Sequence, residues 1–333
     1  MSAYSIRYSQ VFGFPAVVLS DNKSGASVQI LLRGARVNNF FIPLGDNGGL
    51  FDIIAGYESG EEIERGYAAK SFIMAPFSNR IQGGRYGFQG NDYDFQKDGF
   101  QKVSHGLVHN ADFWMETSVI TDSEITCRLT TDKLETGRFQ AYPFSLKFSV
   151  TFTLRGTSLT IRTEAVNTGS VDAPFSTGWH PYFRFPSGIG DVIPTVDASD
   201  IVLIDQDFIP LSGSAAFSPI ENHPELDYRK GKLIGDSKVN VCYILKSSNT
   251  KEKRCSSLYH TKDKIRVTLL QDHGVFYIYT ADDFRGDKRD MVAFEPVECI
   301  TNAFNREELA DTITIPPGAS KVFEMICIAE TGV

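Results

Sequence analysis

A strict alternation of apolar and polar residues between positions 144 and 154 constrains the fold more than any other feature of this chain. Its apolar members are Phe144, Leu146, Phe148, Val150, Phe152 and Leu154. Because successive side chains of a strand point to opposite faces, this period of two predicts a strand with one buried face and one solvated face. Gly156 then marks a turn, and the alternation continues from Leu159 to Ala165. We therefore expect an antiparallel hairpin here.

Strand patterns recur along the rest of the chain. Residues 26–43 predict two strands and a turn, residues 265–280 repeat the strand–turn–strand theme, and residues 313–328 predict a turn between two strands. Helical periodicity is scarce, with one short helical turn expected at 306–310. No linker-like stretch and no repeat of about 20–50 residues interrupts the pattern. We expect an all-β fold, a large antiparallel β-sandwich, with residues 1–333 in a single domain.

Composition narrows the class of partner. The formal net charge of −8 argues against nucleic acid, because a phosphate backbone attracts basic surfaces. Aromatic residues make up 12% of the chain, which favours strands and a surface for a flat ligand such as a carbohydrate. The five cysteines are scattered, which is typical of reduced thiols and not of a disulfide framework or a zinc site. With no signal-peptide pattern and no apolar run of membrane-spanning length, we expect no membrane partner and a cytoplasmic location.

The segment from residue 176 to residue 183 surrounds a histidine with aromatic rings. His180 is flanked by Trp179, Tyr182 and Phe183, and a proline follows it directly. That proline biases the histidine toward an extended backbone and so holds its ring in a fixed direction. Aromatic rings suit the apolar face of a sugar, whose hydroxyls need polar partners. The alternative is a buried histidine that only packs and hydrogen-bonds.

Short motifs, each weak alone, follow one another along nearly the whole chain. They are Gly56-Tyr57, Asn79-Arg80-Ile81, Gly90, Ser104-His105-Gly106 with Trp114, Tyr142-Pro143, Asn167-Thr168-Gly169, His180-Pro181-Tyr182-Phe183, Ile209-Pro210, Asp227-Tyr228-Arg229-Lys230, Ile234-Gly235, Tyr279-Thr280 and Phe294-Glu295-Pro296 with Asn302 and Asn305. In their order and spacing, the chain resembles the aldose 1-epimerase (galactose mutarotase-like) family. The resemblance implies a β-supersandwich with its site in a groove on one sheet face.

Exchange of aldose anomers needs a base for the C1 hydroxyl and an acid for the ring oxygen. Glu295 lies in the apolar sequence Ala-Phe-Glu-Pro, where desolvation would raise the pKa of a carboxyl group toward neutrality, so it is a candidate base. Histidine titrates near neutral pH, so His180 can donate to the ring oxygen and recover the proton. Without the resemblance, Glu295 could equally be a structural carboxylate that accepts backbone N–H bonds.

The resemblance implies the same two roles, Glu295 as base and His180 as acid. It also implies that Arg80 and His105 hydrogen-bond sugar oxygens, and we expect Asn79 and Trp179 to contact the substrate as well. No metal and no other cofactor is implied. Read individually, Arg80 could be an ordinary ion-pair partner and His105 a turn residue.

Two departures from the family pattern bear on the preferred sugar. Many family members carry an aspartate that holds sugar hydroxyls shortly before an apolar strand, and Asn240 is the nearest match here. An amide donates and accepts but lacks charge, so the hydroxyl preference is expected to differ. The motif of His105 has Leu107 where a second glycine is common.

Of the other histidines, we expect His109 to be structural or at the rim.

The remaining histidines, His223, His260 and His273, are expected to be solvated in loops or turns.

Three functions remain open: a mutarotase for a free aldohexose or related sugar, a hexose-6-phosphate mutarotase, and a sugar-binding protein without turnover. The second requires basic residues at the groove rim, for which Arg85 and Arg184 are candidates. The expected partner is a small-molecule sugar, and the expected state is a monomer or a homodimer.

Overall fold

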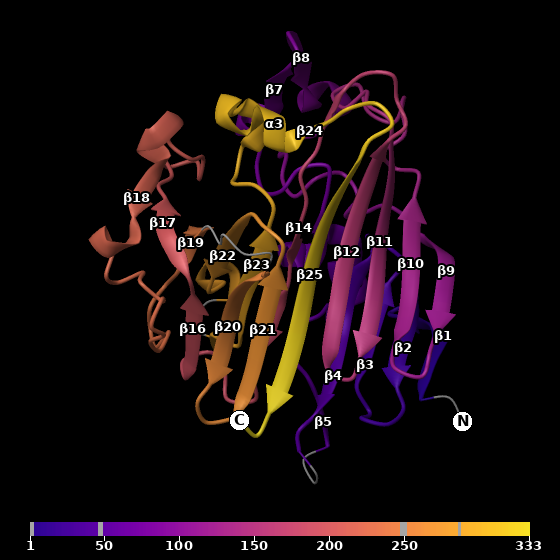
Figure 1. Ribbon diagram of the computed structural model, residues 1–333, viewed down its shortest axis with the longest axis vertical. Helices are drawn as coiled ribbons and strands as arrows, with labels where there is room; N and C mark the ends of the chain where they lie inside the picture. The colour runs from indigo at the N-terminus through magenta and orange to yellow at the C-terminus, as the bar shows by residue number, and fades with distance from the viewer. Residues whose placement is uncertain (1–2, 46–48, 247–251, 286–287) are drawn as a thin grey trace.

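The computed structural model describes residues 3–45, 49–246, 252–285 and 288–333, which are mainly antiparallel strands (Figure 1). A five-stranded sheet at the N-terminus, the N-terminal sheet, has the order β1 (Tyr4–Val11), β2 (Phe14–Asp21), β3 (Ser27–Leu31), β4 (Arg36–Pro43), β5 (Leu50–Asp52). An eight-stranded sheet, the long-strand sheet, has the order β16 (Val192–Val196), β20 (Arg254–His260), β21 (Ile265–Gln271), β25 (Ser320–Thr331), β12 (Ser158–Asn167), β11 (Leu146–Arg155), β10 (Ile125–Thr131), β9 (Trp114–Ile120).

A second eight-stranded sheet, the short-strand sheet, carries the elements that matter most below. Its order is β18 (Phe217–Pro219), β17 (Ala198–Val202), β19 (Asn240–Leu245), β22 (Val275–Tyr279), β23 (Met291–Val297), β14 (Gly178–His180), β6 (Phe72–Met74), with β15 (Tyr182–Arg184) also paired to β23. Two-stranded ladders join β13 (Ala173–Pro174) to β24 (Thr314–Ile315) and β7 (Arg85–Phe88) to β8 (Asn91–Asp94).

Helical segments in the described ranges are short. The α-helices are α1 (Gly60–Arg65), α2 (Asp282–Arg285) and α3 (Ala310–Ile313). The 3₁₀ turns are η1 (Tyr67–Ala69), η2 (Gln82–Gly84), η3 (Phe95–Asp98), η4 (Gly213–Ala216), η5 (Ile220–Asn222), η7 (Ala303–Asn305) and η8 (Glu307–Leu309). In this part of the chain no helix has the length and apolar character needed to cross a membrane.

The predicted hairpin forms as β11 and β12, which pair in antiparallel register from Leu146 opposite Asn167 to Arg155 opposite Ser158. Alternate side chains of β11 are buried, including Phe148 and Phe152. The alternation of apolar and polar residues therefore predicted both the strand and its buried face correctly.

One of the other predicted strand pairs needs correction in how its strands connect. The segment 265–280 does contain two strands, β21 and β22, with a turn at Gly274. They do not pair with each other, because β21 belongs to the long-strand sheet and β22 to the short-strand sheet. The predicted turn between two strands at 313–328 is confirmed as the turn between β24 and β25, and these two strands also lie in different sheets. A turn signal shows that the chain reverses but not which strand becomes the partner.

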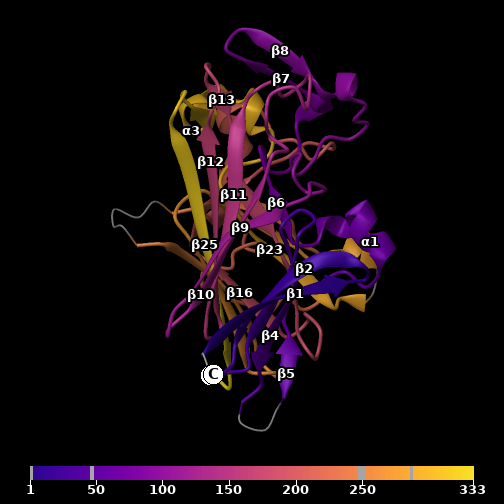
Figure 2. The ribbon, with the colours of Figure 1, turned by 90° about the vertical axis from the view of Figure 1, so that its right-hand side faces the viewer.

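The long-strand sheet forms one layer of the sandwich, and the other two sheets share the layer that faces it. β2 contacts β10 and β11, and β21 contacts β23. Seen from the side, β25 runs on one side of β23, and α1 lies on the other (Figure 2). One cluster of buried side chains fills the space between the layers, with members from all three sheets such as Val17, Phe152 and Phe294. The expected all-β antiparallel sandwich is thus confirmed.

The five cysteines are free thiols, as the sequence predicted, with Cys255 exposed and the other four buried. Burial raises the pKa of the Cys127 thiol to about 12, so this group is protonated near neutral pH and packs as a small apolar side chain.

Replacement of Phe152 by alanine tests the core directly. Phe152 is fully buried between the layers, so we expect Phe152→Ala to lower the free energy of unfolding by about 3–5 kcal/mol. Thr151→Ala on the opposite, partly exposed face of β11 is the matched control and should change it by less than about 1 kcal/mol. Urea denaturation measures both, and equal losses would contradict the assignment of faces.

Candidate functional site

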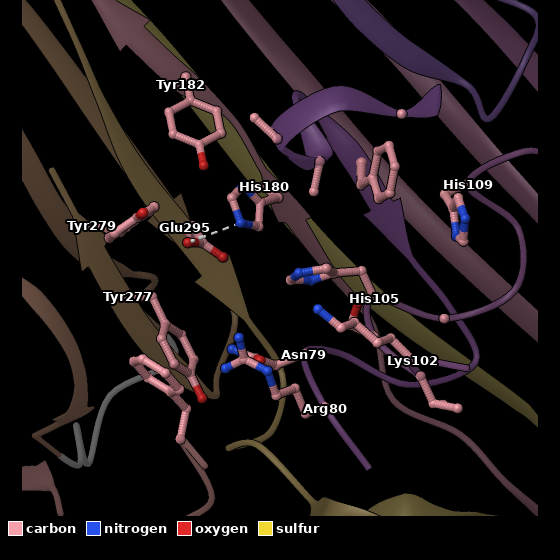
Figure 3. A pocket seen from close by; sticks show the side chains of 18 of the residues that line it. Asn79, Arg80, Lys102, His105, His109, His180, Tyr182, Tyr277, Tyr279 and Glu295 are labelled. Carbon is pink, nitrogen blue, oxygen red and sulfur yellow. Dashed lines mark ion pairs between the residues drawn. The ribbon is translucent and has the colours of Figure 1, made fainter. Parts of the chain in front are cut away.

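A pocket of about 470 Å³ opens on the face of the short-strand sheet that points away from the long-strand sheet. β14, β19, β22 and β23 provide its floor, and the segments 65–72, 79–80 and 100–109 provide its walls. This volume falls within the range of small-molecule binding sites. The labelled side chains of Figure 3 converge on it from elements far apart in the sequence.

Glu295 lies in the middle of β23 and points into this pocket. Its neighbour Phe294 belongs to the cluster of buried side chains between the two layers, here called the main core. The alternation of the strand therefore directs Glu295 to the opposite face. Only 4% of Glu295 is exposed, and Ala293 and Val297 flank it on the same face. Burial raises the pKa of its carboxyl group to about 8, because a charge in this position is poorly solvated.

His180 ends β14, next to β23, where it pairs with Phe72 of β6 and accepts a backbone N–H bond from Ser71 (2.9 Å). Its Nε2 lies 3.4 Å from Oε1 of Glu295 (Figure 3). The residue is 6% exposed, and burial lowers the pKa of the imidazole to about 4. The two groups that the sequence proposed as acid and base therefore lie side by side.

The opposite pKa shifts define the charge state of this pair. Below pH of about 4 both groups hold a proton, and above pH of about 8 neither does. In between, Glu295 and His180 share one proton, so the pair has no net charge. A pair of this kind can release a proton at one atom and accept one at the other.

His105 lies beside His180, in a wall segment between the isolated β-bridges of Ser104 with Arg80 and of Gly106 with Ala75. The rings meet edge to face with centroids 5.0 Å apart, and Nδ1 of His105 lies 3.2 Å from the sulfur of Met74. Burial, followed by the neighbouring His180, His109 and Arg80, holds the pKa of the His105 imidazole well below its usual range. His105 is therefore neutral near pH 7 and can offer one N–H donor and one acceptor.

An unusual backbone holds this wall in place. Asn79, His105 and Gly106 have φ values of 53°, 59° and 79°, and the backbone N–H of His105 donates to the carbonyl of Asn79 (2.7 Å). A Cβ at Gly106 would lie 2.1 Å from the carbonyl oxygen of Ala75, so no other residue fits without moving the chain. Positive φ values at non-glycine residues are uncommon and gather at functional sites.

Arg80 and Asn240 also line the pocket, at its exposed edge. The guanidinium of Arg80 lies over the ring of Phe208, 4.7 Å from its centroid. Asn240 opens β19 opposite Tyr279. Six predicted site residues thus meet in one lining, namely Glu295, His180, His105, Arg80, Asn79 and Asn240.

Trp179 is the exception, and the prediction that it contacts substrate is wrong. Its side chain is fully buried in the main core, where it packs against Phe183 with ring centroids 6.1 Å apart. Trp179 precedes His180 in β14, so the two side chains point to opposite faces of the sheet. The aromatic surroundings of His180 come instead from Tyr182, whose ring centroid lies 5.2 Å away.

Several lining residues were not recognised from the sequence. Tyr277 and Tyr279 alternate along β22 and face Glu295 from one side, and Phe208 and Lys102 complete the rim. The hydroxyl of Tyr277 is fixed by Thr301, from whose backbone N–H it accepts a hydrogen bond (3.0 Å). Apart from the Tyr279-Thr280 motif, the signal for the tyrosines is their period of two, which predicts a strand face but not what that face contacts.

Two predicted phosphate-binding arginines lie outside this pocket, and one histidine that was expected to be solvated is buried. Arg85 is paired with Asp94 and Arg184 with Asp52, and neither lines the pocket, so they are wrong as phosphate-binding candidates. His260 is fully buried and stacks on Phe185, so its predicted solvation is also wrong.

His109 lines the pocket as a wall residue. Its ring stacks on Phe72 with centroids 4.6 Å apart, and burial lowers the pKa of its imidazole to about 4. This agrees with the expected structural or rim position.

The amino-acid sequence of this chain is similar to that of a known protein family and of two proteins from Escherichia coli K12. The aldose 1-epimerase family profile matches residues 16–327. The uncharacterized protein YphB of Escherichia coli K12 is 32% identical over 261 residues, which cover 77% of this chain and 82% of YphB. The uncharacterized protein YihR of the same organism is 24% identical over 249 residues, 74% of each chain.

Among solved structures, a galactose 1-epimerase from Lactobacillus acidophilus NCFM is similar with a TM-score of 0.78 and 17% identity, over 100% of both chains. At this identity the likeness shows the fold alone. It confirms the galactose mutarotase-like sandwich expected from the sequence.

Glu295→Gln provides a test of the buried carboxyl group through stability. The folded-state pKa is raised from 4.5 to about 8, so the folded protein binds more protons than the unfolded chain in that window, and stability falls as pH rises through it. His180, lowered from 6.5 to about 4, acts in the opposite sense up to pH 6.5. Between pH 6.5 and 8 only the Glu295 effect remains of the two. We therefore expect Glu295→Gln to gain stability relative to wild type across that interval.

Thermal or urea unfolding at pH 5, 6.5 and 8 measures this gain. Glu330→Gln removes a solvent-exposed carboxyl group and serves as the control, with no pH-dependent difference expected. A Glu295→Gln difference that stays constant from pH 6.5 to 8 would contradict the burial of a proton on Glu295.

Proposed function

This chain belongs to the aldose 1-epimerase family, and we propose that it interconverts the α and β anomers of a free aldohexose or a closely related sugar. The observation that carries the proposal is the contact between Glu295 and His180, which lie 3.4 Å apart and are both almost fully buried at the floor of the pocket. O1 and O5 of an aldose are attached to the same carbon, so the base and the acid of this reaction must converge on one place.

Ring opening begins when the shared proton, held by Glu295 at rest, moves across the contact to Nε2 of His180, which leaves Glu295 ionised and His180 protonated. Glu295 takes the proton from O1, the C1–O1 bond becomes a carbonyl, and the C1–O5 bond breaks. The electron pair of that bond stays on O5, which takes the proton from Nε2 of His180. The products are the open-chain aldehyde, a protonated Glu295 and a neutral His180.

Ring closure reverses the proton transfers after rotation about C1–C2. O5 attacks the other face of the carbonyl, His180 recovers the proton from O5, and Glu295 returns its proton to the new O1 hydroxyl. The pair ends in its starting state, so no net proton is exchanged with solvent. Burial supports this cycle because it keeps one proton on the pair across the neutral range.

The remaining lining residues have proposed roles in binding. His105, neutral and beside His180, is suited to hydrogen-bond the ring oxygen region, and Arg80 and Asn79 are suited to bind hydroxyl groups. Asn240 offers an amide at the exposed edge of the pocket. An amide there, without a formal charge, supports a hydroxyl preference different from that of a site with a carboxylate.

A hexose-6-phosphate is the second candidate substrate, supported by the cations at the rim. Arg80 and Lys102 both line the pocket, and neither forms an ion pair with any residue in the described part of the chain. Two such side chains could hold a phosphate group. This candidate differs from the first only in the substituent on C6.

Saturation-transfer NMR of the anomeric protons across a sugar panel, with and without 6-phosphates, distinguishes the candidates. Faster exchange of free aldohexoses supports the first proposal, and exchange confined to the phosphates supports the second. Binding without faster exchange would identify a sugar-binding protein without turnover.

Substitution of the acid and the base gives the most direct test of mechanism. We expect Glu295→Gln and His180→Asn each to lower kcat by about 100- to 10,000-fold, the usual contribution of a positioned acid or base. Polarimetry of α-to-β conversion measures the rates, and thermal unfolding verifies that each variant is folded. A folded Glu295→Gln variant with wild-type activity would remove this carboxylate from the mechanism.

The pH dependence of kcat/KM tests whether the reacting form of the Glu295–His180 pair holds one proton. The reacting form holds one proton on the pair, so kcat/KM should be level between pH of about 4 and about 8 and fall on both sides. His180→Asn leaves Glu295 alone, and its residual rate should instead rise with pH as that carboxyl ionises. A wild-type rate that keeps increasing above pH of about 9 would contradict the need for a protonated His180.

A further inference from the structure

Glu298 is a buried carboxylate next to the site that has no part in the reaction described above. It follows β23 directly, three residues after Glu295, and its side chain is 0% exposed. It does not line the pocket, and its partner Lys321 belongs to β25, so the side chain points toward the long-strand sheet. A buried carboxylate needs partners for both of its oxygens, and those partners show what it holds in place.

One oxygen of Glu298 binds the backbone in front of His180. Oε2 accepts the N–H of Thr177 (3.1 Å), and the backbone N–H of Glu298 donates to the carbonyl of Thr177 (2.9 Å). Thr177 lies three residues before His180, just as Glu298 lies three residues after Glu295. These two hydrogen bonds, here called the Glu298–Thr177 clamp, therefore join the segment of the acid to the segment of the base.

The clamp extends a short ladder between two strands. In the described part of the chain, β14 and β23 have one registered pair, Gly178 opposite Val297. Beyond His180, the backbone N–H of Phe294 donates to the carbonyl of Pro181 (3.2 Å). His180 is thus held to β23 by one attachment on each side, and the clamp strengthens the one before it. The contact between the acid and the base crosses the gap between these strands, so a small shift of β14 changes it directly.

The other oxygen of Glu298 anchors the side chain to the rest of the fold. Oε1 lies 3.1 Å from Nζ of Lys321 and 3.1 Å from Nε2 of His273. Lys321 comes from β25 in the opposite layer, and His273 comes from the turn between β21 and β22. The cation of Lys321 compensates a negative charge that would otherwise be costly to bury. This anchor fixes the direction in which Oε2 reaches Thr177.

The hydroxyl-binding side of the pocket has an attachment of its own. The backbone N–H of Asn302 donates to the carbonyl of Arg80 (2.8 Å), and Glu298 does not contribute to that bond. Loss of the clamp is therefore expected to displace His180 relative to Glu295 and to leave Arg80 in place.

We propose that Glu298 is a positioning residue, and that the Glu298–Thr177 clamp sets the distance between Glu295 and His180. This inference rests on the proposed function, because the distance matters for turnover only if a proton crosses that contact. Glu298 touches neither the substrate nor the reacting atoms, and it acts through the backbone of Thr177. Such support holds reacting groups in the geometry that a reaction requires.

Two substitutions of Glu298 separate the clamp from the ion pair. Glu298→Ala removes both, whereas Glu298→Gln keeps an acceptor oxygen at the same reach and removes only the charge. Both should lower the midpoint of thermal unfolding, because Lys321 loses its buried carboxylate. Only Glu298→Ala should lower kcat, by about 10- to 100-fold, which is the effect of a misplaced reacting group. We expect Glu298→Gln to stay within about threefold of the wild-type kcat, and KM to change by less than about threefold in both.

Polarimetry of α-to-β conversion measures kcat and KM, and Asp21→Ala is the matched control. Asp21 is a buried carboxylate at the end of β2 that accepts the backbone N–H of Lys23 (2.9 Å), and it does not line the pocket. Its loss should lower the unfolding midpoint and leave kcat and KM unchanged. Glu298→Met fills a similar volume without an oxygen and gives the same test if the alanine variant does not fold. A folded alanine or methionine variant with wild-type kcat, or an equal loss in Glu298→Gln, would overturn the positioning role.

The ring ¹⁵N NMR signals of His180 give a readout that needs no turnover. Glu295→Gln should shift the Nε2 signal in the wild-type and Glu298→Gln backgrounds, and shift it less in Glu298→Ala, where the contact is longer. If sugars are exchanged but neither kcat nor this shift depends on Glu298, the positioning role fails and the proposed function stands. If no sugar is exchanged, yet the shift depends on Glu298, the clamp stands and the proposed function fails.

Discussion

The buried contact between Glu295 and His180 is the constraint on which the rest of the site depends. Burial disfavours charge on both groups, so it raises the pKa of the carboxyl group and lowers that of the imidazole. The pair consequently retains one proton over the whole neutral range. In the proposed reaction the pair would begin and end each turnover with that proton, so no exchange with solvent would be needed.

The short-strand sheet creates this burial through the alternation of its strands. On β23 and β14, Phe294 and Trp179 enter the main core, and Glu295 and His180 occupy the other face. Side chains of the core and side chains of the pocket are thus neighbours in sequence. The wall around His105 closes the pocket only because Gly106 passes against the carbonyl of Ala75, an approach that a Cβ would prevent.

The motifs of the sequence name residues that share one pocket, but they do not show to which face of a strand a side chain points. The motifs around Arg80, His105 and His180 led to side chains that do meet in one pocket. Trp179 was assigned to that pocket because it is adjacent to His180 in sequence, yet adjacency along a strand means opposite faces. In the same way, the turn at Gly274 was visible, but its two strands joined different sheets.

The sequence by itself determined the secondary structure and the chemistry that was available. A period of two fixes which residues of β11 share a face, and a carboxyl group in an apolar strand is expected to hold its proton. Only the tertiary structure decided that Glu295 and His180, from β23 and β14, lie 3.4 Å apart, and that Glu298 binds the backbone of Thr177. The reason is physical: local alternation depends on backbone geometry alone, whereas solvent exclusion and proton sharing depend on which distant segments pack together.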